Sequence, residues 1–308
     1  MIEYLSILAV LALINVALAV SFNLVLGYGG LVSIAHPVFF ALGAYTSGLL
    51  ARDLGIPVPM AILAGGAVAM AASVALSVPA LRVSGDYMVI TSLGFQLALV
   101  HIITNVEFTG AAGGLTGIPS AFEGAMRSPM AVAAAALFAL ACIFGVRWLM
   151  HGPYGRAVTA MRNDEQALAS LGRSPMAIKV TLFALACGMA GVAGGFYAHH
   201  FLYLTPEQFS TFASTALLTM VVVGGAATTW GPVLGAVLIT LLPEAIRFLD
   251  MPISVMAPLQ GVLFSVLVLV FLYLRPQGLL GGSRAGGGVA AWLGGGAERR
   301  RANTQGTK

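Results

Sequence analysis

The chain is a succession of long apolar stretches separated by short polar segments. A helix needs about 20 apolar residues to cross a hydrocarbon layer of roughly 30 Å. The pattern therefore predicts an all-α, polytopic bundle of about eight to ten membrane spans, of which the second and seventh are the least regular and could be re-entrant. The nine candidates are Ile2–Leu26, Leu31–Leu50, Pro57–Leu81, Tyr87–Val106, Met130–Met150, Met176–Leu204, Phe209–Val223, Pro232–Leu249 and Ile253–Leu274.

The composition indicates that much of the protein surface faces lipid. Hydrophobic residues make up 59% of the 308 residues and charged residues only 8%, whereas a soluble domain carries about 25% charged residues. The apolar stretches are continuous and rich in Ala and Leu, without the alternation of period two that a membrane barrel requires. The N-terminal stretch lacks a basic flank and runs to Leu26, so we expect a span rather than a cleaved signal peptide.

Basic residues predict the orientation of the spans, because Lys and Arg concentrate on the cytoplasmic side. The distribution places the segment 151–175 and the C-terminus in the cytoplasm and the N-terminus outside. It divides the chain into a transmembrane domain, residues 1–280, and a Gly-rich basic tail, residues 281–308, which we expect to be disordered near anionic lipid. The basic residues that support this are Arg82, Arg147, Arg156, Arg162, Arg173, Lys179, Arg275, Arg284, Arg299, Arg300, Arg301 and Lys308.

The segment 151–175 predicts a short helix of two turns between two spans. Asn163 or Asp164 can cap its start, Gly172 ends it, and Pro175 prevents the helix from resuming before the next span. Its apolar positions would form one face suited to a groove on a partner protein, namely Ala167, Leu168 and Leu171. The alternative is an ordinary amphipathic surface loop.

Motifs for ATP hydrolysis and other catalysis are missing. A phosphate-binding loop of the form G-x-x-x-x-G-K-[ST] needs a glycine before its lysine, but Ile178 and Thr307 precede the two lysines, Lys179 and Lys308. The two cysteines, Cys142 and Cys187, each lie in an apolar stretch, so neither a disulfide framework nor a zinc cluster is expected. We expect no enzyme activity and no cofactor, and energy supplied by a partner.

Polar residues inside spans are costly in lipid and tend to face the interior or a water-filled cavity. Six of them are candidates for the lining of a translocation path: Asn23, His36, Gln96, His101, Asn105 and Glu244. The alternatives are an interhelical hydrogen bond for Asn23, satisfaction of carbonyls freed by Pro37 for His36, and a neutral form or a pair with Arg247 for Glu244. An internal duplication is also suggested, because Gly29-Gly30 before Pro37 matches Gly224-Gly225 before Pro232; chance explains this match equally well.

Several segments contain distinctive sequence motifs. These are Ser21-Phe22-Asn23-Leu24, Gly27-Tyr28-Gly29-Gly30-Leu31-Val32-Ser33, Gly114-Leu115-Thr116-Gly117-Ile118-Pro119, Gly155-Arg156-Ala157 with Arg162 and Asp164, and Gly224-Gly225 followed by Gly231-Pro232. Together they cover residues 20 to 280, and the chain resembles the permease subunits of branched-chain amino acid ABC importers, most closely the M-type subunit. Gln166–Gly172 is similar to the "EAA" coupling loop of such permeases, although Gln166 and Leu168 replace the Glu and the second Ala.

The resemblance implies an importer subunit in a bacterial inner membrane. Its implied partners are a homologous H-type permease, two cytoplasmic ATPase subunits and a periplasmic binding protein, and the residues that would couple it to the ATPase are Arg162, Asp164, Gln166, Ala167, Leu168, Leu171 and Gly172. An ion-coupled secondary transporter and a structural membrane protein are the alternatives. The substrate stays open among leucine, isoleucine and valine, and urea, amides or aromatic acids.

Overall fold

The computed structural model describes residues 2–80, 86–122 and 127–247, with isolated positions between 259 and 280. The ninth predicted span, apart from isolated helical positions, and the predicted disordered tail 281–308 lie outside the described residues. The described residues confirm the all-α prediction. The one β contact among them is an isolated bridge between Leu115 and Leu204.

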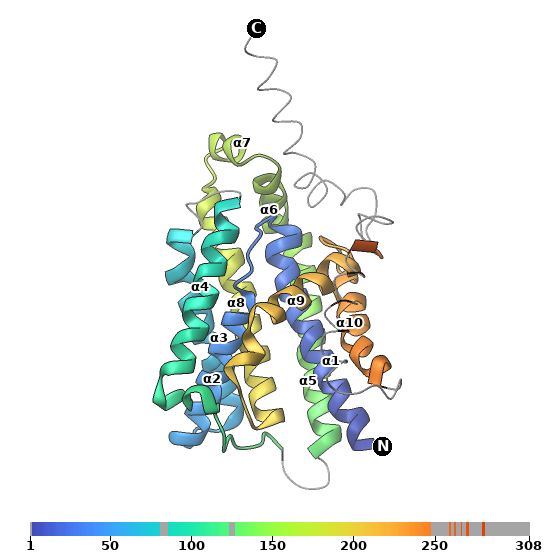
Figure 1. Ribbon diagram of the computed structural model, residues 1–308. Coiled ribbons are helices and arrows are strands. Elements are labelled where there is room, and N and C mark those ends of the chain that lie inside the picture. Colours follow the sequence, from blue (N-terminus) through green and yellow to red (C-terminus); the bar gives the residue numbers. More distant parts are fainter. Residues whose placement is uncertain are drawn as a thin grey trace.

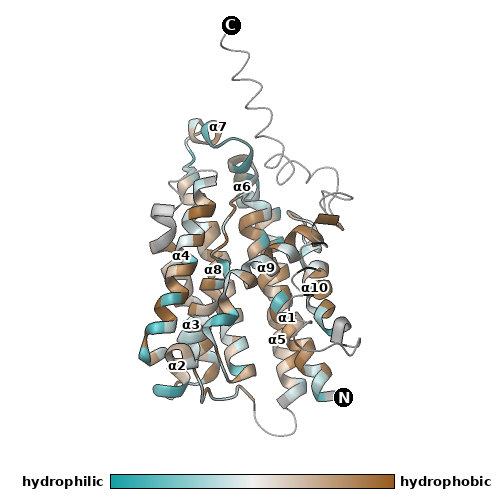
Figure 2. Ribbon diagram, in the orientation of Figure 1, coloured by the Kyte–Doolittle hydropathy of each residue, from teal (hydrophilic) through white to brown (hydrophobic). Residues whose placement is uncertain are grey.

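Each of the first eight predicted stretches contains a helix. Five helices have the length and composition to cross a membrane: α1 (Ile2–Asn23), α3 (Val58–Ala80), α4 (Asp86–Asn105), α5 (Arg127–His151) and α8 (Pro175–Phe201). Three shorter helices complete the bundle: α2 (His36–Asp53), α9 (Thr211–Gly224) and α10 (Gly231–Arg247). Figure 2 shows mostly hydrophobic helices, with hydrophilic segments gathered toward the two ends of the bundle.

The two short helices α6 (Pro153–Asn163) and α7 (Glu165–Ser170) lie at one end of the bundle (Figure 1). The N-terminus lies at the opposite end (Figure 1). The sequence predicted one short helix in this segment, and the structure has two. Pro153 favours the start of α6, because proline is tolerated in the first helical turn.

The second stretch begins later than predicted. A π-helical turn, η1 (Leu24–Tyr28), continues α1, and residues 29–35 are non-helical before α2 begins at His36. Gly30 has φ +67°, which glycine adopts readily, and Pro37 stands in the first turn of α2. The first five residues of this predicted span therefore belong to a break in the helix, and π turns of this kind often mark functional sites.

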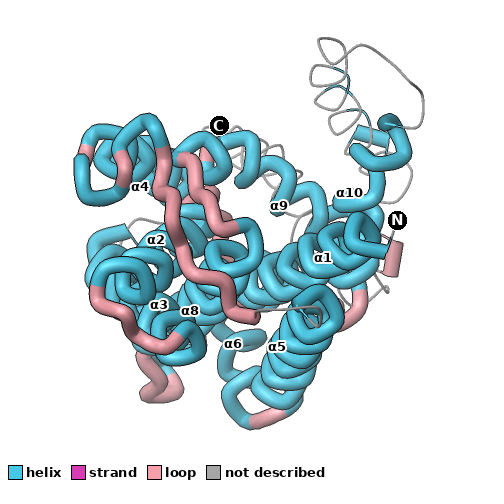
Figure 3. The backbone as a smooth tube through the Cα atoms, turned by 90° about the horizontal axis from the view of Figure 1, so that it is seen from below, coloured by secondary structure: helices cyan, strands magenta, loops and turns pink. Residues whose placement is uncertain are grey.

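Glycines allow α2, α3 and α8 to pack backbone against backbone, as expected for helices in lipid. A Cβ atom at Gly43 would collide with the backbone of Gly191, and one at Gly194 would collide with the carbonyl oxygen of Phe40. Both cysteines are buried within this apolar packing, Cys142 on α5 and Cys187 on α8. The end-on view shows α4 at the edge of the bundle, away from α10 (Figure 3).

We expect Gly194→Ala to destabilise the protein by about 1–3 kcal/mol, because the added methyl group overpacks a backbone contact. Gly145→Ala is the matched control, since nothing lies within 4 Å of a Cβ atom at that position of α5. The control should be neutral, or stabilising by up to about 1 kcal/mol, because alanine favours the helix. Thermal unfolding of the detergent-purified proteins measures both, and equal melting temperatures for the two variants would contradict the packing described.

Candidate coupling site

The α6–α7 segment is organised by Asp164. Its carboxylate accepts hydrogen bonds from the backbone N–H groups of Gln166 and Ala167, both at 2.9 Å, so it caps the start of α7. Asn163 is the last residue of α6 and makes no such bond. Of the two predicted capping residues, Asp164 is therefore the one that caps α7. Gly172 follows α7 at φ +77° and donates its N–H to the Ala169 carbonyl oxygen at 3.0 Å.

The predicted apolar face of α7 is only partly correct. Leu168 is 4% exposed and belongs to the core of this chain. Ala167 is exposed, and Leu171 is 78% exposed. Because residues four apart share a helix face, these two form a small apolar surface that points away from the protein. We call Ala167 and Leu171 the α7 face.

Two contacts attach this segment to α8. The Lys179 ammonium group forms an ion pair with the Glu165 carboxylate at 2.5 Å, and the Lys179 side chain is only 9% exposed. The hydroxyl of Tyr154 donates to the carbonyl oxygen of Ile178 at 3.0 Å, and burial raises the pKa of this hydroxyl above its ordinary value. Sequence reasoning missed the Glu165–Lys179 pair, although a lysine inside an apolar stretch was a signal that an acidic partner is nearby.

Arg162 points into the protein. Its guanidinium group donates a hydrogen bond to the carbonyl oxygen of Gly27 at 2.7 Å, which joins α6 to the π turn at the end of α1. The aliphatic part of Arg162 lies over Gly30, where a Cβ atom would be 3.0 Å from the Arg162 Cγ atom. Burial lowers the pKa of this half-buried guanidinium group from its ordinary value.

Three of the six predicted path-lining residues are buried inside the bundle. Asn23 donates to the carbonyl oxygen of Thr228 and accepts from the N–H of Ala227, both at 2.9 Å. Gln96 donates to the Phe209 carbonyl oxygen at 3.3 Å and accepts from Ser214 at 2.9 Å. His36 hydrogen-bonds Ser21 through Nε2 at 2.9 Å, and its Nδ1 atom has no partner among the described residues.

The other three predicted residues lie elsewhere. His101 and Asn105 are exposed on α4, where the Asn105 amide donates to the His101 carbonyl oxygen at 2.7 Å. Glu244 is half-buried on α10 and accepts a hydrogen bond from the hydroxyl of Tyr4 on α1. The six residues therefore do not converge on one site within this chain, and their path-lining role stays a prediction.

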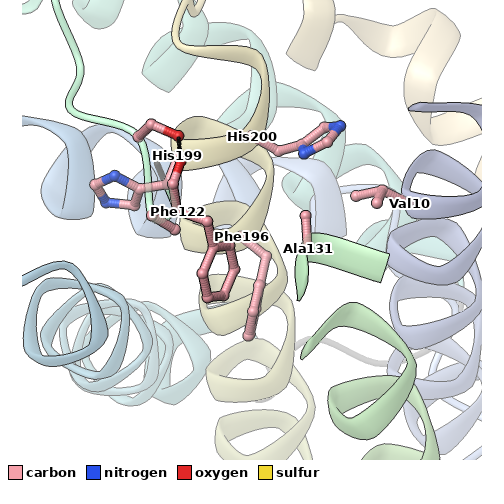
Figure 4. Close-up of a pocket in the computed structure, with 8 residues that line it drawn as sticks. Val10, Phe122, Ala131, Phe196, His199 and His200 are labelled. Atoms are coloured by element: carbon pink, nitrogen blue, oxygen red, sulfur yellow. Dashed lines mark hydrogen bonds between the residues drawn. The ribbon is translucent and has the colours of Figure 1, made fainter. Parts of the chain in front are cut away.

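One pocket lies where α1, α5, α8 and the loop before residue 123 meet. Figure 4 shows His199 and His200 pointing to opposite sides of α8 beside it. The His199 ring is held between the Ser47 hydroxyl and the Pro119 carbonyl oxygen, both at 2.8 Å. The pocket offers about 20 Å³, room for a water molecule and not for an amino acid.

Comparisons with known proteins point to transport. Residues 4–272 match the family described as "Branched-chain amino acid transport system / permease component". The chain is 32% identical over 300 residues to the high-affinity branched-chain amino acid transport system permease protein LivM of Escherichia coli strain K12, and equally to that of Salmonella typhimurium strain LT2; each alignment covers 89% of this chain and 69% of the relative. It is 25% identical over 214 residues to the probable branched-chain amino acid transport permease protein LivM of Methanocaldococcus jannaschii, over 66% of this chain and 62% of that one. No solved structure matches the chain significantly.

Proposed function

Because the chain belongs to the family of branched-chain amino acid transport permeases, we propose that it forms part of the translocation path of an ATP-driven importer and takes its energy from cytoplasmic ATPase subunits. The family makes the chain a membrane transport subunit. The α7 face is the observation that carries the proposal. A capped helix, anchored to α8 at one end of the bundle and with an exposed apolar surface, suits insertion into a groove on a partner.

The proposed mechanism follows from this attachment. Closure of an ATPase pair displaces α6 and α7, and the Glu165–Lys179 pair carries the displacement to α8. Movement of packed helices past one another then opens the path toward the opposite side. In this proposal α7 is cytoplasmic, the N-terminus is extracytoplasmic, and a periplasmic binding protein delivers the substrate.

We further propose leucine, isoleucine and valine as substrates, supported by the names of the relatives. The test is uptake of labelled leucine by a strain that lacks the gene and by the same strain complemented with it. Complementation should restore uptake, and excess isoleucine or valine should compete whereas urea and benzoate should not. Unchanged leucine uptake in the deletion strain, without compensation by another carrier, would refute the proposed substrate.

The proposed second permease subunit needs a surface, and α4 offers the best one. Only 22% of the α4 apolar stretch is buried, the smallest share among the five candidate spans. Polar side chains in spans face protein or water rather than lipid, and the exposed side of α4 is mixed: it carries Thr91, His101 and Asn105 beside the small Gly94 and Ala98 and the apolar Ile90, Leu97 and Ile102. The exposed face of α5 is instead apolar, with Leu137, Phe144 and Trp148. We therefore propose that the second permease faces α4 and that lipid faces α5.

A bulky side chain on α4 should disrupt this association. We expect Ala98→Trp to lower co-purification of the second permease and leucine uptake by roughly tenfold or more, because an overpacked interface loses about 1–3 kcal/mol. Leu137→Trp, at a 72% exposed position of α5, is the matched control and should leave both unchanged. Normal assembly of the Ala98→Trp variant would show that the partner packs elsewhere.

A further inference from the structure

Among the described basic residues at this end of the bundle, Arg162 is the one that donates a hydrogen bond to the end of α1. In the described part of the chain the ion pairs are Arg52–Asp53 and Glu165–Lys179, so the half-buried Arg162 has no carboxylate partner. Its hydrogen-bond acceptor is a carbonyl oxygen at the end of a helix, where the helix dipole is negative. Hydrogen bonds from a charged donor are the stronger ones.

The acceptor lies at the break between α1 and α2. Gly27 belongs to the π turn η1, and the non-helical residues 29–35 follow it. Ile34 in this segment donates its N–H to the Ser92 hydroxyl of α4 at 3.0 Å, and His36 at the start of α2 hydrogen-bonds Ser21 of α1. A displacement of Gly27 therefore acts on the start of α2 and on α4.

Resting on the proposed function, we propose that Arg162 is a positioning residue that transmits the movement of α6 and α7 to the broken α1–α2 segment and, through it, to α4. The short helices α6 and α7 are then connected to two different parts of the bundle. The Glu165–Lys179 ion pair connects α7 to α8, and Arg162 connects α6 to the break between α1 and α2. Gly30 belongs to the same device, because its φ of +67° favours glycine and a Cβ atom there would press against the aliphatic part of Arg162, 3.0 Å from its Cγ atom.

The test uses the whole complex, with both permeases, the ATPase subunits and the leucine-loaded binding protein, reconstituted in vesicles. For Arg162→Ala we expect normal co-purification of the ATPase and normal basal ATP hydrolysis. Leucine transported per ATP hydrolysed should fall by roughly tenfold or more, the factor that corresponds to the loss of one charge-assisted hydrogen bond. Arg162→Lys keeps a charged donor and should recover most of the loss.

Two further variants make the result specific. Gly30→Ala should reproduce part of the Arg162→Ala defect, because the added methyl group shifts the aliphatic part of Arg162 without removing its charge. Arg156→Ala removes a positive charge from an exposed position of α6 itself and should transport normally.

Each alternative outcome has a distinct meaning. Loss of ATPase co-purification in Arg162→Ala would make Arg162 a docking residue and overturn the inference while leaving the proposed function standing. Normal transport per ATP in Arg162→Ala would also overturn it. Failure of the unmodified complex to couple ATP hydrolysis to leucine transport would refute the proposed function itself.

Discussion

Replacing Ala167 by arginine is expected to abolish leucine uptake while the protein stays in the membrane in its normal amount. Ala167 is exposed on α7, so a longer side chain at this position can extend away from the protein. A long charged side chain there would enter the proposed ATPase groove, where an unpaired buried charge is strongly unfavourable. We expect at least a hundredfold loss of uptake, corresponding to about 2.7 kcal/mol or more of lost docking energy.

Ala169→Arg is the matched control for this variant. It places the same side chain at an exposed position of the same helix, and residues two apart do not share a face. The control should retain most of the uptake, and Ala167→Arg should also lose co-purification of the ATPase. Uptake that is equal in the two arginine variants would show that the α7 face is not the docking surface.

Gly172→Pro tests the same helix through its backbone. Proline fixes φ near −65° and has no N–H group, whereas Gly172 has φ +77° and donates to the Ala169 carbonyl oxygen. The end of α7 must therefore rearrange, and uptake should fall together with ATPase co-purification. Gly172→Pro changes the shape of α7, whereas Ala167→Arg changes its surface. If both variants lose uptake and ATPase co-purification, the loss is due to docking and not to a defect of one substitution.

The second large effect is expected at Asn23, which joins the end of α1 to the loop after α9. Asn23→Leu leaves the Ala227 N–H and the Thr228 carbonyl oxygen without their partner, and Asn23 is 1% exposed. Both backbone groups are partly buried. Because a fully buried group left unpaired costs about 1–3 kcal/mol, we expect a loss of about 2 kcal/mol for the two together. Thermal unfolding in detergent measures it.

Asn15→Leu is the comparison for this effect. Asn15 donates to the Thr240 hydroxyl at 2.9 Å, and that hydroxyl also donates to the Ala236 carbonyl oxygen. Only side-chain groups lose a partner here, and interhelical hydrogen bonds of this kind average about 0.6 kcal/mol in membranes. Asn23→Leu should therefore be clearly the less stable of the two variants; the reverse order would mean that the loop after α9 does not depend on Asn23.

The apolar pattern predicted the helices well because span length is dictated by the membrane. It missed the late start of α2, since the apolar character of the chain continues through residues 31–35 although the helix does not. The signals for this break were local ones, Gly29-Gly30 and Pro37. They recur around Gly225 at φ +117°, and in both places the next helix begins six residues after the second glycine, at His36 and at Gly231. This similarity supports the predicted duplication, which stays a prediction.

The direction of individual side chains was the part that sequence could not supply. In a helix of six residues one or two apolar positions do not define a buried face, so Leu168 was grouped with Ala167 and Leu171 although it packs inward. Arg162 was assigned to ATPase coupling through the resemblance to the permease family, which does not give the direction of its side chain. Its aliphatic part and its charged end allow it to lie across a protein surface and reach a carbonyl oxygen, which only the placement of α6 against α1 reveals.

The burial of Cys142 and Cys187 has a practical consequence. A maleimide that cannot cross membranes reacts with exposed thiols, and both native thiols are enclosed by packed helices. The unaltered chain is therefore a low-reactivity background into which single cysteines can be introduced, one at Ser170, the last residue of α7, and one at Gly113 near the other end. Labelling of these two positions in intact cells would assign each end of the bundle to its compartment without first replacing the natural cysteines.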